Sequence, residues 1–535
     1  MKNINCTNKN YAQVEENYQL KLQFDLNILI PEDDSVRLLS LITEELDYTK
    51  LEKAYSLKGR NPVVQPKILF QILVYAYMND IYSSRKIEIA CKRDINFMWL
   101  LRGQKCPDHN TIARFRTGKL KGVVDDLFNQ TIVKLHSLGQ IDYENIFIDG
   151  TKIESVANKY TFVWKKSISK FEIKLESKII KLFEDINLEY SKNFSLSMLD
   201  NKLDSLCLVL KFLIDIKDNS NIEFVYGKGK RKSKLQRFYE LISDYICKQN
   251  KYNIYNANFD GRNSFSKTDI DATFMHLKED HMRNSQLKPA YNVQIGVEGE
   301  YIVGLDISSE RSDQLTLIPF LDKLGESLPA KYKNIVADAG YESEENYVYL
   351  DRNNQTSYIK PQIYESMKTR KFKNNISKRE NMKYNKEEDT YTCFNNKILR
   401  MMNTTTRTSK SGYKAIVNIY ECESCANCEL KEKCTKAKGN KKISVSNKFI
   451  DFRNNSTSNI TTNFGKLARM NRSIQVEGAF GVLKENHNFR RFLTKGKQNV
   501  KIEFTLLCFA YNLNKLHTRI QNNKTGVSFY KKEIV

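Results

Sequence analysis

The sequence predicts a mixed α/β protein, in which helices flank a mixed sheet, an all-helical segment comes first and two insertions interrupt the sheet. Three observations predict this class. Short apolar runs end at Asp149 and Asp338, as buried strands do. Between them, residues 291–297 and 301–307 have the pattern of a β-hairpin. Long stretches elsewhere repeat apolar residues every three or four positions, which favours helices.

The composition indicates which class of partner the protein binds. The chain has 535 residues, of which 41% are hydrophobic, enough for packed cores. Its 86 Lys and Arg exceed its 63 Asp and Glu, giving a net charge of +23, which favours a polyanionic partner. No signal-like apolar segment and no run near the ~20 residues of a membrane span is visible. We therefore expect a soluble cytoplasmic protein that binds nucleic acid rather than a membrane.

Residues 1–140 are expected to form an all-helical domain with a DNA-binding role. Pro31 is expected to open one helix, and a second follows Pro66. Asn110 or Thr111 is expected to cap a later helix. Four basic side chains there either face phosphates or form a solvated helix face, and the sequence favours neither: Arg114, Arg116, Lys119 and Lys121.

The core is expected in three pieces, residues 141–160, 285–365 and 465–520. The first holds the strand that ends at Asp149, and the second holds the hairpin, a helix, the strand that ends at Asp338, and a further helix and strand. The third is helical again. The remaining segments are a helical insertion at 161–284, a β- and cysteine-rich insertion at 366–464 and a basic tail at 521–535.

Three acidic residues are the candidate catalytic groups. Asp149 and Asp338 end strands, where α/β sheets bind ligands, and Glu477 lies within a helix. Singly, an Asp at a strand end is more often a cap or turn residue. Brought together, three carboxylates would repel one another and raise their pKa values. Mg²⁺ would relieve the repulsion, and a pair of such ions can clamp the reacting oxygens of a phosphoryl transfer.

Four blocks of sequence resemble a known family. FIDGTKIES (147–155), VADAGYES (336–343) and RSIQVEGAFGVLK (472–484) are similar to the signature blocks of bacterial insertion-sequence transposases of the DDE class. FMWLLRGQKCPDHNTIARFR (97–116) resembles the helical N-terminal domain of that family. The blocks occur in the family's order, and the resemblance covers roughly residues 60–520.

The resemblance implies an RNase H-like core in which Asp149, Asp338 and Glu477 hold two Mg²⁺ or Mn²⁺ ions. It implies cleavage at the ends of a mobile element and joining of the 3′-hydroxyl to target DNA. The partners would be double-stranded DNA, with terminal inverted repeats and a target, and a second copy of the chain in the DNA complex; the protein would associate with the nucleoid when bound. A catalytically inactive DNA-binding relic and a general nuclease of the same fold are the alternatives.

A signature of related transposases extends around Glu477. Lys484 matches the lysine seven residues later, and could hold a DNA phosphate. The arginine expected four residues before Glu477 is one position earlier, at Arg472, and Met470 replaces the expected tyrosine. In relatives this signature is linked to cleavage through a DNA hairpin. Because the arginine is displaced and the tyrosine is absent, the sequence leaves open whether cleavage here passes through such a hairpin. Candidate DNA contacts are Arg472, Lys484, Arg490, Arg491, Lys495 and Lys497.

Eleven cysteines without a signal segment argue against a disulfide scaffold. Cys422, Cys425, Cys428 and Cys434 have the spacing C-x₂-C-x₂-C-x₅-C, which can surround a structural Zn²⁺. An iron–sulfur cluster is one alternative, although the ferredoxin cysteine motif has three residues between its last two cysteines and a proline after the last one. Reduced thiols without metal are the other. We expect the remaining seven cysteines in the core. His281 is either structural or a phosphate contact.

Overall fold

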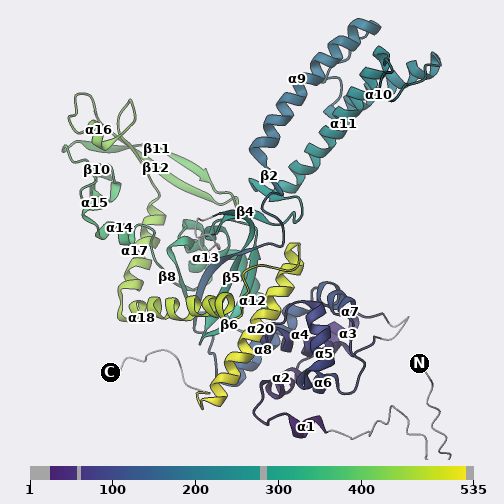
Figure 1. Ribbon diagram of the computed structural model, residues 1–535. Helices are drawn as coiled ribbons and strands as arrows, with labels where there is room; N and C mark the ends of the chain where they lie inside the picture. Colours follow the sequence, from purple (N-terminus) through teal and green to yellow (C-terminus); the bar gives the residue numbers. More distant parts are fainter. Residues whose placement is uncertain (1–24, 57–61, 278–285, 526–535) are drawn as a thin grey trace, which may run out of the picture.

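The computed structural model describes residues 25–56, 62–277 and 286–525. It is a mixed α/β protein, as the sequence predicts: N-terminal helices and a long C-terminal helix pack beside a central sheet, and a helical arm and a smaller β lobe project from this body (Figure 1). His281 lies outside the described residues, as does most of the basic tail. Within the described ranges, no helix combines the length and apolarity needed to span a bilayer.

The N-terminal helices begin at caps that differ partly from those expected. Helix α4 (Pro66–Met78) starts at its proline as predicted, and it packs against α20 (Lys497–Gln521). Helix α2 (Ser35–Glu44) begins four residues after Pro31, because the Asp34 carboxylate accepts a hydrogen bond from the helix N-terminus. The other elements are α1 (Leu26–Leu29), α3 (Thr49–Lys53), α5 (Ser84–Arg93), α6 (Ile95–Leu101), α7 (His109–Arg114), the π-helix η1 (Phe115–Lys119) and α8 (Val124–Ser137).

The cap of α7 was assigned wrongly from the sequence. Asp108 caps this helix, and its Oδ1 accepts from the Thr111 N–H at 2.8 Å. Asn110 and Thr111 are therefore helical residues. An aspartate two residues earlier takes the capping position because its carboxylate reaches the third N–H of the helix.

The central sheet has six strands. They are β1 (Asn145–Glu154), β4 (Thr273–His276), β5 (Leu287–Glu298), β6 (Tyr301–Ser308), β7 (Asn334–Ala337) and β8 (Thr356–Ile359). Strand β5 pairs antiparallel with β1 on one side and with β4 and β6 on the other, whereas β7 pairs parallel with both β1 and β8. Helix α12 (Leu317–Ser327) connects β6 to β7, and α13 (Glu344–Arg352) connects β7 to β8.

The hairpin between β5 and β6 confirms the prediction. Its two-residue turn places Gly299 at φ +56° and Glu300 at φ +67°. Two consecutive positive φ angles are typical of a type I′ turn, whose twist matches that of the flanking strands.

Strand β1 is longer than predicted, and this difference moves Asp149 from a strand end to mid-strand. The parallel ladder with β7 covers only Asn145 to Ile148. The antiparallel ladder with β5 continues from Phe147 to Glu154. Asp149 therefore lies where the parallel ladder stops, inside a strand that one neighbour still holds.

One long helical segment, residues 463–486, crosses the sheet. It consists of α18 (Asn463–Arg472), the π-helix η5 (Ser473–Glu477), α19 (Gly478–Gly481) and a second π-helix, η6 (Val482–Asn486). Helix α18 lies against β1, β7 and β8, and η5 lies against β1 and β5. The whole segment follows α17 (Asn447–Thr461) in the chain.

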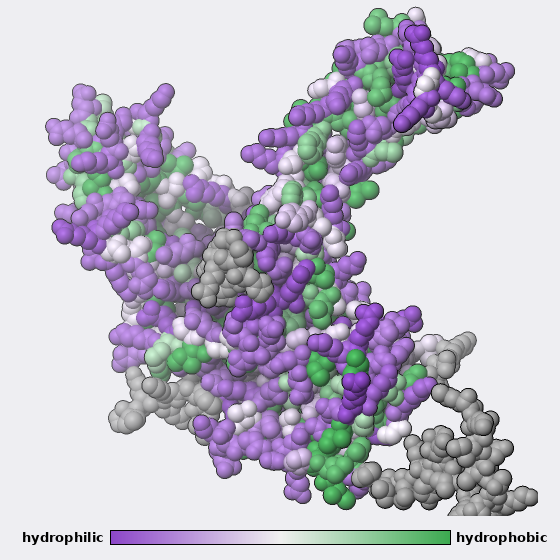
Figure 2. Space-filling view, viewed as in Figure 1, coloured by the Kyte–Doolittle hydropathy of each residue, from purple (hydrophilic) through white to green (hydrophobic). Residues whose placement is uncertain are grey.

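The arm and the lobe are the two insertions. The arm consists of α9 (Lys165–Tyr190), α10 (Lys202–Asn219) and α11 (Lys234–Phe259), which share a core of their own, and β2 (Phe162–Trp164) pairs with β3 (Ser264–Ser266) at its base. The lobe, in the insertion expected to be β- and cysteine-rich, holds a five-stranded antiparallel sheet. Hydrophilic residues dominate the visible face of both (Figure 2). The lobe comprises α14 (Tyr364–Lys368), α15 (Arg370–Lys373), β9 (Lys383–Asn385), β10 (Thr390–Thr392), β11 (Ile398–Thr408), β12 (Lys414–Cys422), α16 (Lys431–Cys434) and β13 (Lys442–Val445).

Candidate active site

Sheet register places Asp149 beside Asp338. The last pair of the parallel ladder is Ile148 with Ala337, and each aspartate is the next residue of its chain. Burial raises the pKa of Asp149, the nearby Arg472 and the Gly150 N–H lower it, and the charge of Asp338 raises it. The two carboxylates therefore interact electrostatically.

Glu477 reaches the same place from the helical segment. It ends the π-helix η5, which packs on β1 and β5, and 62% of its side chain is exposed. Asp149, Asp338 and Glu477 all line one cavity of about 640 Å³. The fold thus brings together the three acids that the sequence singled out.

An arginine balances the charge of this cavity. Arg472 Nη1 lies 2.9 Å from Asp149 Oδ2, and Arg472 Nη2 lies 3.5 Å from Glu477 Oε1. The guanidinium bridges the two carboxylates. Among the described residues, no three Asp, Glu, His or Cys side chains are placed to hold an ion directly. The donor set suits a hard divalent cation, and such an ion would compete with Arg472.

The π-helix η5 accounts for the position of Arg472. In an α-helix, residues four apart share a face, whereas the π-helix makes i to i+5 hydrogen bonds and so accommodates one more residue in the turn. Arg472 precedes Glu477 by five residues, and the π-helix between them aligns the two side chains. The one-residue displacement in the sequence is thereby compensated in the fold.

Sequence reasoning missed a fourth acid, Asp313. It opens a short 3₁₀ turn between β6 and α12, lines the same cavity, and accepts hydrogen bonds from Asn292 Nδ2 at 2.7 Å and Gln294 Nε2 at 3.2 Å. A Cβ at Gly150 would lie 2.3 Å from Gln294 Nε2 and 3.0 Å from Asp313 Oδ1. A side chain at position 150 would therefore have to displace the buried Gln294 amide. No periodic pattern marks Asp313, and only its place before a helix would have suggested a local role.

Tyr341 is buried close to these acids. Its side chain is fully buried, and its hydroxyl donates to Gln294 Oε1. Burial, together with the carboxylates of Asp313 and Asp149, raises the pKa of Tyr341. The phenol thus remains a neutral hydrogen-bond donor that fixes the amide of Gln294.

Three of the six candidate DNA contacts lie at this cavity. Arg472, Lys484 and Arg490 line it. Arg490 Nη2 also pairs with Glu485 at 2.6 Å. Lys288 lines the cavity as well, with its Nζ 3.0 Å from Glu154 Oε2.

The other three candidates lie elsewhere. Arg491 binds backbone, because its Nε donates to Ser155 O at 3.0 Å and its Nη2 to Val156 O at 2.6 Å. Lys495 and Lys497 are exposed and are not among the residues that line the cavity. The fold therefore ties the segment after the helix to the end of β1 and leaves these two lysines at the surface.

One basic residue of the N-terminal domain does not face solvent. Arg116 is buried, and its Nη1 donates to Tyr82 O at 2.7 Å and to Tyr77 Oη at 3.2 Å. The suggestion that Arg116 faces phosphates is therefore wrong, since its guanidinium is used inside the helical domain.

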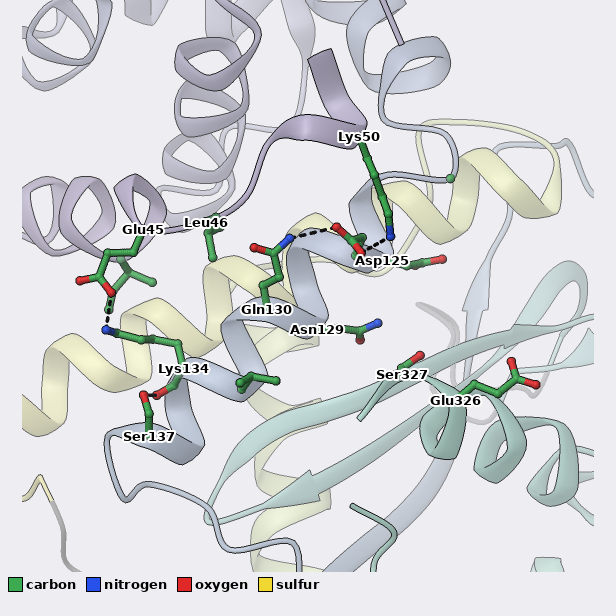
Figure 3. A pocket seen from close by; sticks show the side chains of 14 residues that line it. Glu45, Leu46, Lys50, Asp125, Asn129, Gln130, Lys134, Ser137, Glu326 and Ser327 are labelled. Carbon is green, nitrogen blue, oxygen red and sulfur yellow. Dashed lines mark hydrogen bonds and ion pairs between the residues drawn. The ribbon is translucent and has the colours of Figure 1, made fainter. Parts of the chain in front are cut away.

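A second cavity, of about 670 Å³, lies between α2, α8 and the end of α12 (Figure 3). Two of its lysines pair with carboxylates of the same cavity, Lys50 with Asp126 and Lys134 with Glu45. Gln130 adds a hydrogen bond to Asp126 at 2.9 Å. The cavity at the sheet gathers Asp149, Asp338 and Glu477 and is therefore the candidate active site.

Comparison with protein families gave two matches. A transposase DDE domain matches residues 392–517, which include Glu477 and begin after Asp149 and Asp338. A transposase domain (DUF772) matches residues 24–118. Neither the curated proteins nor the solved structures gave a match. The two family matches support an insertion-sequence transposase of the DDE class.

Proposed function

We propose that this transposase cleaves DNA at the ends of its element and joins the freed 3′-hydroxyl to target DNA. In this proposal Asp149, Asp338 and Glu477 are the catalytic acids and hold two Mg²⁺ or Mn²⁺ ions. The observation that carries it is that three acids from distant parts of the chain line one cavity. The family match supports the role of Glu477, which it includes.

The sheet supports an RNase H-like core. The strand that carries Asp149 pairs with an antiparallel hairpin on one side and with the parallel strand before Asp338 on the other. Helices α12 and α13 make the connections around β7. Such a sheet fixes two carboxylates at the end of a short parallel ladder, where ligands of α/β sheets bind.

The chain's own residues would bind and orient the DNA. Lys484, Lys288 and Arg490 line the cavity and can contact phosphate oxygens around the scissile bond. Asp313 and Gln294 hold the backbone beside Asp149 in place. Arg472 keeps the carboxylate pair neutralised before the cations bind. Bound divalent cations would supply activation of the attacking water or hydroxyl and neutralise charge at the phosphate.

The test is strand cleavage with and without the acids. Supercoiled plasmid carrying the DNA that flanks the reading frame is incubated with Mg²⁺ and the wild type, Asp149→Asn or Glu477→Gln. The matched control is Asp244→Asn in the arm, whose carboxylate is half-exposed and pairs with Lys248. We expect nicking and joining by the wild type and the control, and loss of both in the two site variants. Equal nicking by all four proteins would refute the proposal.

The same assay separates the alternatives. A general nuclease would cleave plasmids with and without the flanking DNA equally and would join no ends. An inactive DNA-binding relic would bind the DNA and leave it intact. Repeat-dependent cleavage followed by joining excludes both.

A further inference from the structure

Five cysteines of the lobe line one small cavity. Cys422 ends β12, Cys425 and Cys428 follow in the next loop, and Cys434 ends α16. The fifth, Cys393, lies directly after β10 and lines the same cavity, of about 20 Å³, which is close to the size of a single ion or water. Cys393 is also partly buried against the lobe core; the expectation of a core position is wrong for Cys207 and Cys247, which are exposed in the arm.

Strand register explains why Cys393 reaches the cluster. In the lobe sheet, Leu399 pairs with Tyr391 on one side and with Cys422 on the other. Cys393 begins the turn that joins β10 to β11, and its N–H donates to Lys397 O at 2.9 Å. The turn is thereby fixed beside the end of β12, where the cysteine run begins.

The sulfur atoms differ in their hydrogen bonds. Cys425 Sγ accepts from the Lys441 N–H at 3.3 Å, and Cys428 Sγ accepts from Asn395 Nδ2 at 3.5 Å. Donors directed at sulfur stabilise the thiolate that a metal needs. Cys422 Sγ instead donates to Ser424 O at 3.7 Å. Its side chain is almost completely buried in the lobe core.

The spacing of the cysteines along the chain also favours a ligand set without Cys422. Three cysteines separated by two residues each are too close together for all of them to occupy corners of one tetrahedron without strain. A Cys₄ site usually combines a close pair of cysteines with cysteines from elsewhere in the chain. Two of these three, together with a later cysteine and one from another segment, match that arrangement. Cys393, in the turn between β10 and β11, supplies the group from another segment, so that Cys422 is not needed.

The lobe also needs a stabilising element. Its core is a single small cluster: Met382, Tyr391, Leu399, Tyr420, Cys422, Cys425, Ile443 and Val445. Much of β11 is exposed. Small units with little buried apolar surface commonly rely on a metal or on disulfides, and every cysteine in the described ranges is free.

We propose that the lobe binds one structural Zn²⁺ through Cys393, Cys425, Cys428 and Cys434, with Cys422 as a core residue. In this structure the sulfurs are not closed on one point, since no three metal-binding side chains among the described residues are placed to hold an ion. The four thiols nevertheless line one shared cavity, of about the size of a single ion. Lys441, whose Nζ donates to Cys434 O at 3.3 Å, supplies positive charge beside the cluster.

Metal content of the full-length protein tests this site independently of DNA chemistry. Zinc and iron per chain are measured by mass spectrometry for the wild type, Cys393→Ser, Cys428→Ser, Cys422→Ser and Cys207→Ser; Cys207 is exposed in the arm. We expect one zinc and no iron in the wild type. The first two variants should lose the zinc, and the last two should keep it.

Other outcomes overturn the proposal. Iron, or no metal, in the wild type would remove the zinc site, and zinc kept by Cys393→Ser or lost from Cys422→Ser would refute the ligand set. If a variant fails to fold, thiol alkylation of the wild type still decides. Zinc should protect Cys393 and Cys428, and a chelator should expose them, whereas equal alkylation of both cysteines with and without chelator would refute their ligation.

Discussion

The acidic cavity at the sheet and the thiol cavity of the lobe both gather potential metal ligands from distant segments, but their charges are balanced differently. In the acidic cavity, Arg472 pairs with Asp149 and Glu477. In the thiol cavity, burial raises the pKa of Cys422 to about 12 and also raises the pKa of Cys434. The carboxylates are thus neutralised by a cation, whereas Cys422 and Cys434 are held neutral by their own protons.

This difference fits the two proposed roles. A site balanced by a guanidinium can exchange that cation for a metal ion, as the proposed reaction centre must. A thiol site releases protons when it binds metal and then closes, so metal binding contributes directly to folding. The comparison predicts that changes in the first region alter chemistry, whereas changes in the second alter folding and metal content.

The largest expected effect on the reaction is that of Asp338→Asn. It removes one charge from the pair beside the parallel ladder, and we expect DNA strand cleavage to fall by about 100-fold or more. Asp244→Asn in the arm should leave the rate unchanged. The rates are measured with Mg²⁺ on flanking DNA, and an Asp338→Asn rate within a few-fold of the wild type would contradict the assignment.

Gly150→Ala should come next. The added Cβ would meet the Gln294 amide at 2.3 Å, so the buried network beside Asp149 must shift, with an expected loss of about 1–3 kcal/mol in the free energy of unfolding and reduced cleavage. Gly118→Ala is the matched control, because its Cβ would have no neighbour within 4 Å. Equal denaturation midpoints and equal cleavage rates for the two variants would argue against the close approach.

Arg472→Gln tests the cation balance. Without divalent ions, the variant should lose about 1–3 kcal/mol in the free energy of unfolding, because Asp149 is left partly buried without its counter-charge. Mn²⁺ should restore much of the loss, since it replaces the missing positive charge. Unfolding with and without Mn²⁺ measures this, and an equal deficit in both conditions would contradict an arginine that stands where a cation binds.

Glu298 is a third acidic group whose charge balance can be compared with that of the two cavities. Of the changes considered, its substitution should affect the reaction least. Burial and the proximity of Asp142 raise the pKa of this carboxyl to about 8, although it accepts bonds from the Asp142 N–H at 2.9 Å and Tyr332 Oη at 2.7 Å. Having no arginine or metal, it should keep its proton as the thiols do. Between pH 5 and 8 the native state then binds more protons than the unfolded state, so stability falls as pH rises.

Glu298→Gln isolates this dependence, because the amide resembles the protonated acid. We expect the stability of the wild type relative to Glu298→Gln to decline from pH 5 to 8, by at most about 1.4 kcal/mol per pH unit. Denaturant unfolding at several pH values measures it. A difference that stays flat or rises with pH would show that Glu298 is ionised in the fold.

Regular apolar patterns made much of the core predictable. The hairpin and the strand before Asp338 follow from alternation and from a short apolar run, and the structure confirms both. The extension of β1 past Asp149 was missed, because half-buried residues there pair with β5 alone. The lobe sheet was largely missed for a related reason: exposed, polar strands such as β11 carry no apolar signal.

The contacts of the site were less predictable than its acids. Sequence blocks indicated Asp149, Asp338 and Glu477, but the pairing of Arg472 with Asp149 joins residues 323 positions apart. This pairing also depends on a π-helical turn, which no residue pattern in the sequence predicts. Asp313 and Cys393 lie in turns, where neither periodicity nor motif spacing applies, so only the packed sheets reveal their neighbours.

Binding of Mn²⁺ is the most direct test of the central claim that three distant acids share cations at one place. Ions bound per chain are counted by electron paramagnetic resonance with a DNA duplex present, for the wild type, Asp149→Asn and Glu477→Gln. We expect two ions on the wild type and loss of binding in both variants. Retention of both ions by Glu477→Gln would contradict it.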